Sequence, residues 1–568
     1  MTGAIHNESR QWERWATTAV AAYLAIFVLL VHLPTFRGLT SPDAMRYADA
    51  ARNFLQGEGI VTNNVYPRNL ADSRFTERLH AAQVREKYVR HFGYPLVLAL
   101  PFALLGPSDA TVFAFNALLW WLGGLLVFWL GRRLFSVKAG GLAVLLYSLQ
   151  AKLVAYAVKG VSEPFCIVLL LVGAWLILTD RRAWWTGMLA GALGAFSFFV
   201  RQPMLFVTPL TFAGFLLLRE DGRWRRAGWI AAGVVTVFAL RAVMMPVLFP
   251  PSPPPSGQYV AASSSAITAS PESATDKLLH RFLGFSFLTF SQRFPGHALE
   301  RSIDNPRGGD ESATSLFAQK LATNLRLLPR IVALESGAPL WAAFFLAACW
   351  LGWGHRRVRR LTGLVGVLYA ATAFAGIVYF VMPRYFHLFI PFMALVGGYG
   401  LGLLVERLAK WDTRLSGAAA AVVVLAVSMP LPFGHLLPVL PGDATVREAR
   451  GTAAAHEKAV AVGDFLRRET GPEDVVFSDI PWITGWYADR ASIWLPLRPE
   501  QVRELHRWVA ADRLLLTLED PQGFAVWRDW LLAKRQGTLG ADRLGDWTLQ
   551  AGTTHGGKAV YLFRAPGD

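Results

Sequence analysis

Three basic residues stand singly in short turns between long apolar runs of this sequence. They are Lys159, Arg201 and Arg384, and the turn that holds Lys159 also carries an acid, Glu163. A further carboxylate, Asp43, opens a predicted helix, where the helix dipole alone would favour it by ~0.3–1 kcal/mol. Structural ion pairing is the ordinary explanation for each cation taken alone. Isolated cations together with a carboxylate instead predict a site for an anionic lipid headgroup.

The segment around Asp43 has the signature of a short amphipathic helix. Ser41 and Pro42 precede the acid, helix-forming residues follow, and Gly57 closes the segment. Asp49 lies well away from Asp43 around the helix axis. We expect the helix to lie at a membrane surface directly after the first span. Its apolar residues share one face, and they are Ala44, Tyr47, Ala48, Ala51, Phe54 and Leu55.

The composition places the surrounding elements in a membrane. Of the 568 residues, 53% are hydrophobic and 17% are charged, with a mean hydropathy of +0.34 and a formal net charge of +16. So many apolar residues exclude an intrinsically disordered chain. A disulfide scaffold is excluded because the two cysteines, Cys166 and Cys349, both lie in apolar stretches. The composition therefore predicts a multi-span membrane protein.

Eleven apolar runs are long enough, or nearly so, for the ~20 residues that a helix needs to cross a bilayer core. We interpret the shorter run Tyr94–Leu105, which ends at Gly106-Pro107, as a half-crossing or a surface helix. The first run lacks a small-residue cleavage site, so we expect it to be retained. The eleven runs are 15–33, 110–131, 139–157, 163–179, 184–200, 203–218, 226–249, 338–354, 361–381, 385–405 and 416–433.

Basic clusters beside these runs indicate the topology. All of them share one side of the membrane if Tyr94–Leu105 does not cross, and the positive-inside rule makes that side cytoplasmic. We therefore predict a mainly α, polytopic fold of about 11 spans, with the N-terminus inside and large outer loops over about 34–93 and 250–337. The clusters are Arg10 and Arg14; Arg132, Arg133 and Lys138; Arg181 and Arg182; Arg219, Arg223, Arg225 and Arg226; Arg356, Arg357, Arg359 and Arg360; and Arg407, Lys410 and Arg414.

The tail from residue 435 differs from the rest of the chain. It holds 16 Lys+Arg against 18 Asp+Glu. The basic excess therefore belongs to residues 1–434, where topology accounts for much of it, and no nucleic-acid partner is needed. Helices and strands alternate along the tail, which predicts a soluble α/β domain over 435–568 on the outer side. The predicted helices are 455–469, 482–487, 499–510 and 524–534, and the predicted strands are 475–478, 492–495, 513–517 and 559–563.

Short motifs occur in order along about residues 15–430. Together they resemble the GT-C glycosyltransferases, and most closely the protein mannosyltransferase-like and aminoarabinose-transferase-like membrane enzymes. The resemblance implies a membrane enzyme that takes a sugar from a polyprenyl-phosphate donor at the outer face. The motifs are Pro42-Asp43, Tyr47, Ala51-Arg52-Asn53, Gly57 and Gly59 after the first span, then Phe92-Gly93-Tyr94-Pro95, Leu130-Gly131-Arg132-Arg133-Leu134-Phe135, Ser162-Glu163-Pro164 and Pro383-Arg384-Tyr385-Phe386.

The resemblance also implies roles for the acids. The acid that matches Asp43 acts as the catalytic base for the acceptor hydroxyl, and Glu163 matches a second outer acid that supports the acceptor or the base. In many members another acid directly follows the first, whereas Ala44 stands at this position. Attack opposite the departing phosphate would invert the anomeric centre, by the geometry of inverting glycosidases.

The departing phosphate needs fixed positive charge rather than a general acid. We expect the outer cations Arg384, Arg201 and Lys159, with Tyr385 beside Arg384, to bind the donor phosphate. In the second loop, an aromatic and basic segment holds His280 and Arg281. This segment is either a surface helix over the polyprenyl chain or donor sugar, or an interfacial aromatic anchor.

Two other functions fit the same features. A transporter or flippase of an anionic lipid-linked substrate would also place cations such as Lys152 and Arg241 inside spans. A non-catalytic scaffold with a glycan-binding tail is the third alternative. The sugar is open, the acceptor is a lipid, a glycan or a protein, and nothing in the sequence requires a divalent metal or another cofactor.

Overall fold

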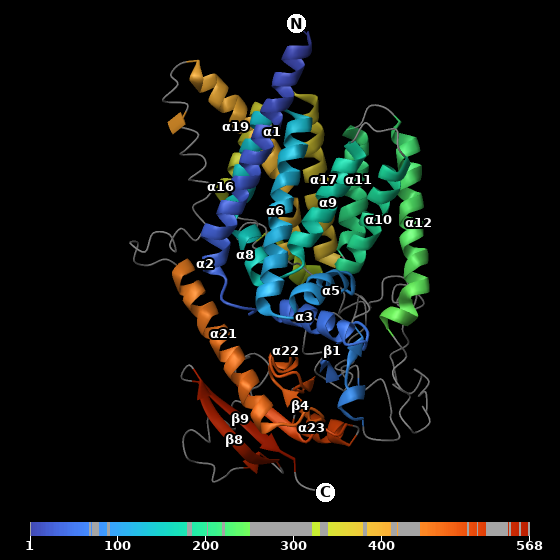
Figure 1. The fold of residues 1–568 in the computed structure, drawn as a ribbon, viewed down its shortest axis with the longest axis vertical. Helices are drawn as coiled ribbons and strands as arrows, with labels where there is room; N and C mark the ends of the chain where they lie inside the picture. The colour runs from blue at the N-terminus through green and yellow to red at the C-terminus, as the bar shows by residue number, and fades with distance from the viewer. Residues whose placement is uncertain are drawn as a thin grey trace.

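The computed structural model shows a helical bundle, two short helices across one end of it, and a mixed sheet beyond them (Figure 1). It describes residues 2–67, 70, 79–87, 91–178, 184–201, 203–218, 222–249, 321–329, 339–378, 383–410, 417–418, 444–496, 499–507, 509–517, 543–544, 547–555 and 558–565.

Helices occupy ten of the eleven predicted apolar runs, and the last run, 416–433, lies outside the described residues except for 417–418. The predicted run 139–157 is bent by 61° into two helices, because residues 149–150 leave the helical conformation. The helices of the bundle are α1 (Thr2–Phe27), continued by η1 (Val28–His32) and α2 (Leu33–Thr35), α6 (Asp109–Leu134), α7 (Val137–Ser148), α8 (Ala151–Lys159), α9 (Glu163–Leu178), α10 (Trp184–Val200), α11 (Met204–Leu218), α12 (Arg223–Leu248), α16 (Pro339–Leu351), α17 (Arg356–Val378) and α19 (Ile390–Ala409).

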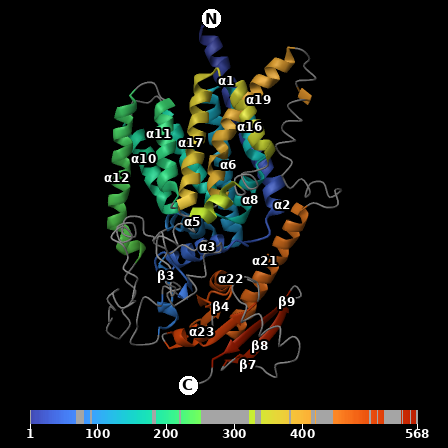
Figure 2. The ribbon, with the colours of Figure 1, turned by 180° about the vertical axis from the view of Figure 1, so that it is seen from behind.

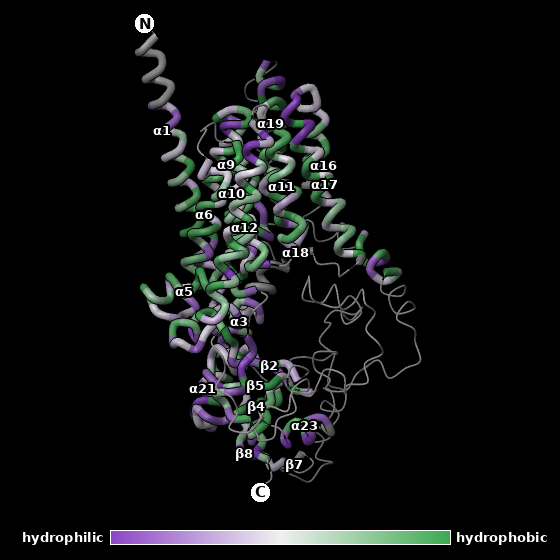
Figure 3. Tube along the Cα trace, turned by 90° about the vertical axis from the view of Figure 1, so that its right-hand side faces the viewer, coloured by the Kyte–Doolittle hydropathy of each residue, from purple (hydrophilic) through white to green (hydrophobic). Residues whose placement is uncertain are grey.

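Among the described residues, five helices are long and apolar enough to cross a membrane, or six if α7 and α8 form one bent span. Four further apolar helices are shorter, namely α5 (Gly93–Leu105), α9, α10 and α11. Hydrophobic residues predominate along the middle of the bundle, whereas hydrophilic segments gather around α21 (Ala444–Glu469) and α23 (Pro499–His506) (Figure 3). The chain therefore has the apolar helices of a multi-pass membrane protein.

Within the described residues, members of three predicted basic clusters make contacts at the end of the bundle away from the sheet, where α1 begins and α6 and α19 end (Figure 1). Arg132 pairs with Glu13 at 3.3 Å, and Lys138 pairs with Glu406 at 3.3 Å. Arg357 donates a hydrogen bond to the Leu134 carbonyl at 2.8 Å. These described members of clusters that the sequence assigned to one side of a membrane thus lie at one end of the fold.

Glycines bring the backbones of the bundle helices close together. A Cβ atom at Gly233 of α12 would collide with the Met188 carbonyl oxygen of α10, and one at Gly191 of α10 would collide with the Ile230 carbonyl oxygen of α12. Small residues allow such close approach in membrane helix pairs. Because α10 leads directly to Arg201, this packing sets where that predicted cation lies.

Helices α3 (Pro42–Leu55) and α5 (Gly93–Leu105) lie side by side across the end of the bundle that faces the sheet (Figures 1 and 2). The apolar face predicted for α3 is buried at Ala44, Tyr47, Ala48 and Ala51, whereas Phe54 is half-buried and Leu55, at the end of the helix, is exposed. The run that we interpreted as a half-crossing or a surface helix forms α5. A two-stranded antiparallel pair, β1 (Val61–Thr62) with β3 (Glu86–Lys87), completes the described part of the first loop.

The tail forms most of a seven-stranded sheet in the order β2-β5-β4-β6-β9-β8-β7. The β2–β5, β5–β4 and β4–β6 pairs are parallel, and the remaining pairs are antiparallel. Helices α21 (Ala444–Glu469), α22 (Pro481–Trp486) and α23 (Pro499–His506) pack with it. The strands are β2 (Asn64–Val65), β4 (Val475–Ser478), β5 (Ala491–Trp494), β6 (Arg513–Leu516), β7 (Arg543–Leu544), β8 (Trp547–His555) and β9 (Lys558–Arg564).

The alternating pattern of the tail is confirmed at every predicted element within the described residues, and the predicted helix 524–534 lies outside them. The structure adds β7 and β8, whose sequences lack a continuous apolar run. It also adds β2, which belongs to the predicted first loop yet forms an edge of the tail's sheet. The first loop therefore contributes one strand to the sheet of the tail.

Candidate active site

Asp43 and Arg384 form an ion pair between two short helices. Asp43 lies in the first turn of α3, and Arg384 lies in α18 (Pro383–Phe386), which precedes α19. An Arg384 Nη1 hydrogen is donated to Asp43 Oδ2 at 2.5 Å, and Arg201 Nη2 lies 3.8 Å from the same oxygen. Two of the three predicted cations, Arg384 and Arg201, therefore face the Asp43 carboxylate.

Glu163 and Arg201 form a second ion pair behind the first. Glu163 Oε1 accepts a hydrogen bond from Arg201 Nη1 and lies 3.7 Å from Arg384 Nε. The side chains of Glu163 and Arg201 are 1% and 5% exposed, against 34% for Asp43 and 26% for Arg384. The accessible edge of the cluster is thus Asp43 with Arg384, supported by a buried pair.

Glu163 and Tyr385 complete the surroundings of the Arg201 guanidinium. Glu163 Oε2 is buried and has no hydrogen-bond partner in the described part of the chain. The Tyr385 ring lies under the Arg201 guanidinium, with 5.6 Å from Cζ to the ring centroid. A ligand at the accessible edge would therefore meet carboxylate oxygens, guanidinium hydrogens and an aromatic ring.

The charges of the cluster control how Asp43 ionises. Burial would raise the pKa of Asp43, but the positive charges of Arg384 and Arg201 outweigh burial and lower that pKa to about 2. Burial and then the charge of Asp43 raise the pKa of the neighbouring Tyr47 to about 12. At neutral pH Asp43 is therefore an anion and Tyr47 is a neutral phenol, so Asp43 is the group of the two that can accept a proton.

The turn before α9 fixes Glu163 against α3. Gly160 adopts φ +73°, a conformation that favours glycine, and its carbonyl accepts a hydrogen bond from the Tyr94 hydroxyl at 3.3 Å. The Tyr94 ring packs edge-on against Tyr47, with 5.0 Å between centroids. Ala44 is fully buried, and a Cβ at Gly160 would lie 3.5 Å from the Ala44 Cβ. The position after Asp43 therefore packs against the bundle and does not join the charged cluster.

The structure brings five predicted site residues together: Asp43, Glu163, Arg201, Arg384 and Tyr385. Lys159 is the last residue of α8, half-buried and four residues before Glu163. His280 and Arg281 lie outside the described residues. No group of three His, Cys, Asp or Glu side chains that could hold a metal ion occurs in the part of the chain that the structure describes.

Lys152 and Arg241 lie in predicted spans, where charged residues commonly pair with an acid such as Glu163. The structure shows other partners for Glu163. Glu163 pairs with Arg201 and Arg384. The Arg241 guanidinium instead lies over the Phe199 ring, with 5.3 Å from Cζ to the centroid, and Lys152 is exposed. A cation–π contact with an aromatic ring is one way in which an arginine is accommodated at membrane depth.

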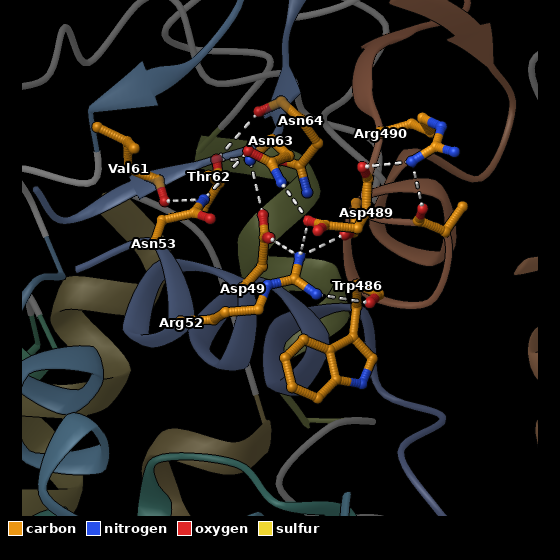
Figure 4. A network of polar contacts seen from close by, with 12 residues as sticks. Asp49, Arg52, Asn53, Val61, Thr62, Asn63, Asn64, Trp486, Asp489 and Arg490 are labelled. Atoms are coloured by element: carbon orange, nitrogen blue, oxygen red, sulfur yellow. Dashed lines mark hydrogen bonds and ion pairs between the residues drawn. The ribbon is translucent and has the colours of Figure 1, made fainter. Parts of the chain in front are cut away.

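Sequence reasoning missed a polar network on the opposite side of α3. Asp49 is 1% exposed, and its carboxylate accepts hydrogen bonds from Arg52 at 2.8 Å and from the Asn63 amide at 2.6 Å (Figure 4). Arg52 also pairs with Asp489 of the tail at 2.7 Å. The i,i+3 spacing of Asp49 and Arg52 was a local signal for the first pair, but nothing local indicated Asp489.

Comparison with known proteins agrees with this architecture. The family model described as dolichyl-phosphate-mannose-protein mannosyltransferase matches residues 91–249. The apo crystal structure of ArnT from Cupriavidus metallidurans superposes with a TM-score of 0.53 at 12% identity, covering 98% of each chain. The chain has the GT-C fold.

A second GT-C structure supports the same architecture. The apo oligosaccharyltransferase from Archaeoglobus fulgidus superposes with a TM-score of 0.51 at 11% identity, covering 89% of this chain and 70% of that one. No curated protein matches the sequence. ArnT and the archaeal enzyme both belong to the GT-C glycosyltransferase superfamily, so the resemblance drawn from the short motifs is confirmed.

Proposed function

We propose that this chain is an inverting glycosyltransferase that moves a sugar from a polyprenyl-phosphate donor to an acceptor hydroxyl. The observation that carries the proposal is the accessible Asp43–Arg384 pair, supported by the buried pair of Glu163 and Arg201. The matching family model is described as dolichyl-phosphate-mannose-protein mannosyltransferase. Structures similar to this one include ArnT bound to undecaprenyl phosphate and the archaeal oligosaccharyltransferase with a dolichol-phosphate and an inhibitory peptide.

The donor phosphate takes the place of Asp43 beside Arg384. A phosphate oxygen accepts hydrogen bonds from guanidinium groups more strongly than from neutral donors, and Arg384 with Arg201 presents such a pair. Engaging these cations removes the influence that holds the pKa of Asp43 near 2. The added negative charge raises that pKa further, so Asp43 becomes a stronger base when the donor is bound.

The transfer step then uses Asp43 as general base. Asp43 takes the proton of the acceptor hydroxyl while the hydroxyl oxygen attacks the anomeric carbon from the face opposite the phosphate. The bond from that carbon to the phosphate oxygen breaks, and its electron pair leaves with the phosphate. Arg384, Arg201 and Lys159 stabilise the charge of the departing group. Glu163 holds Arg201 in place.

The membrane arrangement follows the sequence prediction. We propose about 11 spans with the N-terminus in the cytoplasm, a transmembrane catalytic domain over 1–434 and a soluble domain over 435–568. The basic clusters at one end of the bundle and the Asp43 cluster at the other support an active site on the outer face of the cytoplasmic membrane. In this arrangement the acceptor is a lipid, glycan or protein of the cell envelope.

The test is donor turnover in proteoliposomes. Purified protein is incubated with a panel of polyprenyl-phosphate sugars and candidate acceptors, and released polyprenyl phosphate is quantified. We expect release with at least one donor, and we expect the Asp43→Asn variant to fold normally but lose transfer. Full activity of Asp43→Asn would refute the assignment of the base. Movement of intact donor across the bilayer without release would identify a transporter instead.

A further inference from the structure

The soluble tail contacts the chain on both sides of Asp43. One set of contacts holds Asp49 and Arg52, which follow Asp43 on α3, and the other holds Leu39, which precedes it. We propose that the tail is a positioning unit for the catalytic base, with Arg52 and Tyr487 as the positioning residues. This inference rests on the proposed function, in which Asp43 acts as general base.

The first set of contacts centres on the Arg52 guanidinium. Its Nη2 lies 2.8 Å from Asp49 Oδ1 and 2.7 Å from Asp489 Oδ1, and it donates to the Gly485 carbonyl at 2.8 Å. Nη1 donates to the Trp486 carbonyl at 3.1 Å (Figure 4). One cation of α3 thus joins a carboxylate of its own helix to a carboxylate and two carbonyls of the tail. Its side chain is 12% exposed, so loss of a partner would leave largely buried charge.

The backbone around Arg52 is shaped for this contact. Gly485 permits close approach, since a Cβ there would lie 3.3 Å from Asp49 Oδ2. Asp489 adopts φ +55°, which is uncommon for a residue other than glycine and turns its carboxylate toward Arg52. The Trp486 ring covers the guanidinium, with 5.1 Å from Cζ to the ring centroid, and stacks on Phe102 of α5. These features indicate that the backbone is specifically arranged for the Arg52 contact, which is therefore more than an incidental surface ion pair.

Strand β2 connects the same network to the tail's sheet. Asn63 donates its backbone amide to Asp49 and its side-chain amide to Asp489 at 3.2 Å, while its carbonyl accepts from the Ser492 amide at 2.6 Å. The following residues, Asn64 and Val65, pair in parallel with β5. Asp49, six residues after Asp43, is therefore hydrogen-bonded to the residue that precedes the edge strand β2.

The second set of contacts lies before α3. The Tyr487 hydroxyl bonds the Asp109 carboxylate at 2.7 Å and the Leu39 carbonyl at 2.9 Å, and the Leu39 amide bonds Asp109 at 3.0 Å. Trp486 Nε1 donates to the other Asp109 oxygen at 2.8 Å. Asp109 begins α6, so these bonds connect the tail, the residue that leads into α3 and a bundle helix.

Asp43 lies between these two attachments. It is four residues after Leu39 and six residues before Asp49, and Asp43 and Asp49 share one continuous helix. At ~1.5 Å per residue, Asp43 lies ~9 Å along α3 from Asp49. A tilt of α3 by ~6° about Asp49 would therefore move Asp43 by ~1 Å. Misplacement by ~1 Å can cost ~100-fold in rate. The cations Arg384 and Arg201 belong to the bundle and would stay in place, so the tail should affect catalysis more than donor binding.

The experiment measures kcat and donor KM for variants of the tail contacts in the full-length protein. Arg52→Gln is expected to lower kcat about 100-fold and to leave donor KM within about twofold. The charge-exchanged double variant Arg52→Asp with Asp489→Arg keeps one cation between two acids and is expected to recover at least about tenfold of that loss. Tyr487→Phe keeps the ring and removes the hydroxyl, which contacts Asp109, Leu39 and His456, and we expect it to lower kcat about tenfold.

Arg467→Gln is the matched control, because it breaks an exposed Arg467–Asp464 pair on α21 of the same tail. It should change neither kcat nor KM. Hydrogen exchange of the α3 amides, measured in parallel, should be faster in Arg52→Gln and unchanged in Arg467→Gln. Faster exchange with wild-type kcat would overturn the proposal, and so would an Arg52→Gln loss that the double variant does not recover. Absence of donor turnover in the wild type would refute the proposed function, whereas the exchange result is independent of it.

Discussion

Arg384 donates a hydrogen bond to Asp43 across 341 residues of sequence, and the two side chains form the accessible edge of an otherwise buried charge cluster. The pair leaves Asp43 a weak base in the free protein and a stronger one once an anion engages Arg384. In the proposed mechanism, binding of the donor phosphate and activation of the base are thus two consequences of one contact. The same proposal accounts for proton transfer to a carboxylate with so low a pKa.

Removing the Arg384 charge should impair both donor binding and the chemical step. We expect Arg384→Gln to lower kcat/KM by ~10²–10³-fold, the range for loss of one preorganised donor to a developing charge. Arg384→Lys should be intermediate, since lysine keeps the charge but not the planar pair of donors. Donor titrations in proteoliposomes measure both constants. A wild-type kcat/KM in the glutamine variant would contradict the role of Arg384.

The pH dependence of the reaction should report the same ion pair. Because the pKa of Asp43 in the folded protein, about 2, lies below the ordinary value of ~3.9, the stability that the pair contributes is present above about pH 4 and is lost as the pH falls toward 2. The acid limb of kcat/KM that belongs to free Asp43 should therefore lie below about pH 4. Arg384→Gln removes the largest opposing charge, so the limb should move to higher pH. An unchanged acid limb in this variant would argue against Asp43 as the titrating base.

The buried pair of Glu163 and Arg201 should matter for stability more when one partner is lost than when both are. Glu163→Gln leaves the buried Arg201 charge without its nearest carboxylate, and such losses typically cost ~3–5 kcal/mol. The double variant Glu163→Gln with Arg201→Met removes the uncompensated charge and should be less destabilised than the single variant. Thermal unfolding in detergent gives the comparison. A double variant less stable than Glu163→Gln would show that the pair is not the source of the cost.

Two glycines of α12 allow a matched test of helix packing. Gly233→Ala places a Cβ against the Met188 carbonyl of α10, and forcing the helices apart should destabilise the protein by ~1–3 kcal/mol. Gly228→Ala has no atom within 4 Å of the new Cβ and should stabilise slightly, because alanine favours the helix. Shifts of opposite sign in the unfolding temperature are expected. Equal shifts would show that the α10–α12 contact does not limit stability.

Local patterns determined much of the architecture. The apolar runs predicted the helices of the bundle, and the Ser-Pro-Asp start and Gly57 end predicted α3 within a few residues. The tail's alternation predicted β4, β5, β6 and β9. These features are readable because the length and period of an apolar pattern depend only on neighbouring residues.

The candidate site was partly readable for a different reason. Charged residues are costly near a membrane, so the few that stand in outer turns were conspicuous, and Asp43, Glu163, Arg201 and Arg384 proved to be one cluster. Asp49 and Arg52 were not singled out as site residues, because an Asp–Arg pair on a helix face is an ordinary surface pattern.

The sequence by itself thus determined where the helices run, which end of the bundle is basic and which few charges are unusual. The tertiary structure alone decided that Arg384 pairs with Asp43, that Arg52 reaches Asp489 and that β2 joins the sheet of the tail. Each of these contacts joins segments hundreds of residues apart. Their geometry depends on how helices pack at close glycine contacts and on which edge of a sheet is open. Neither property produces a periodic pattern in the sequence.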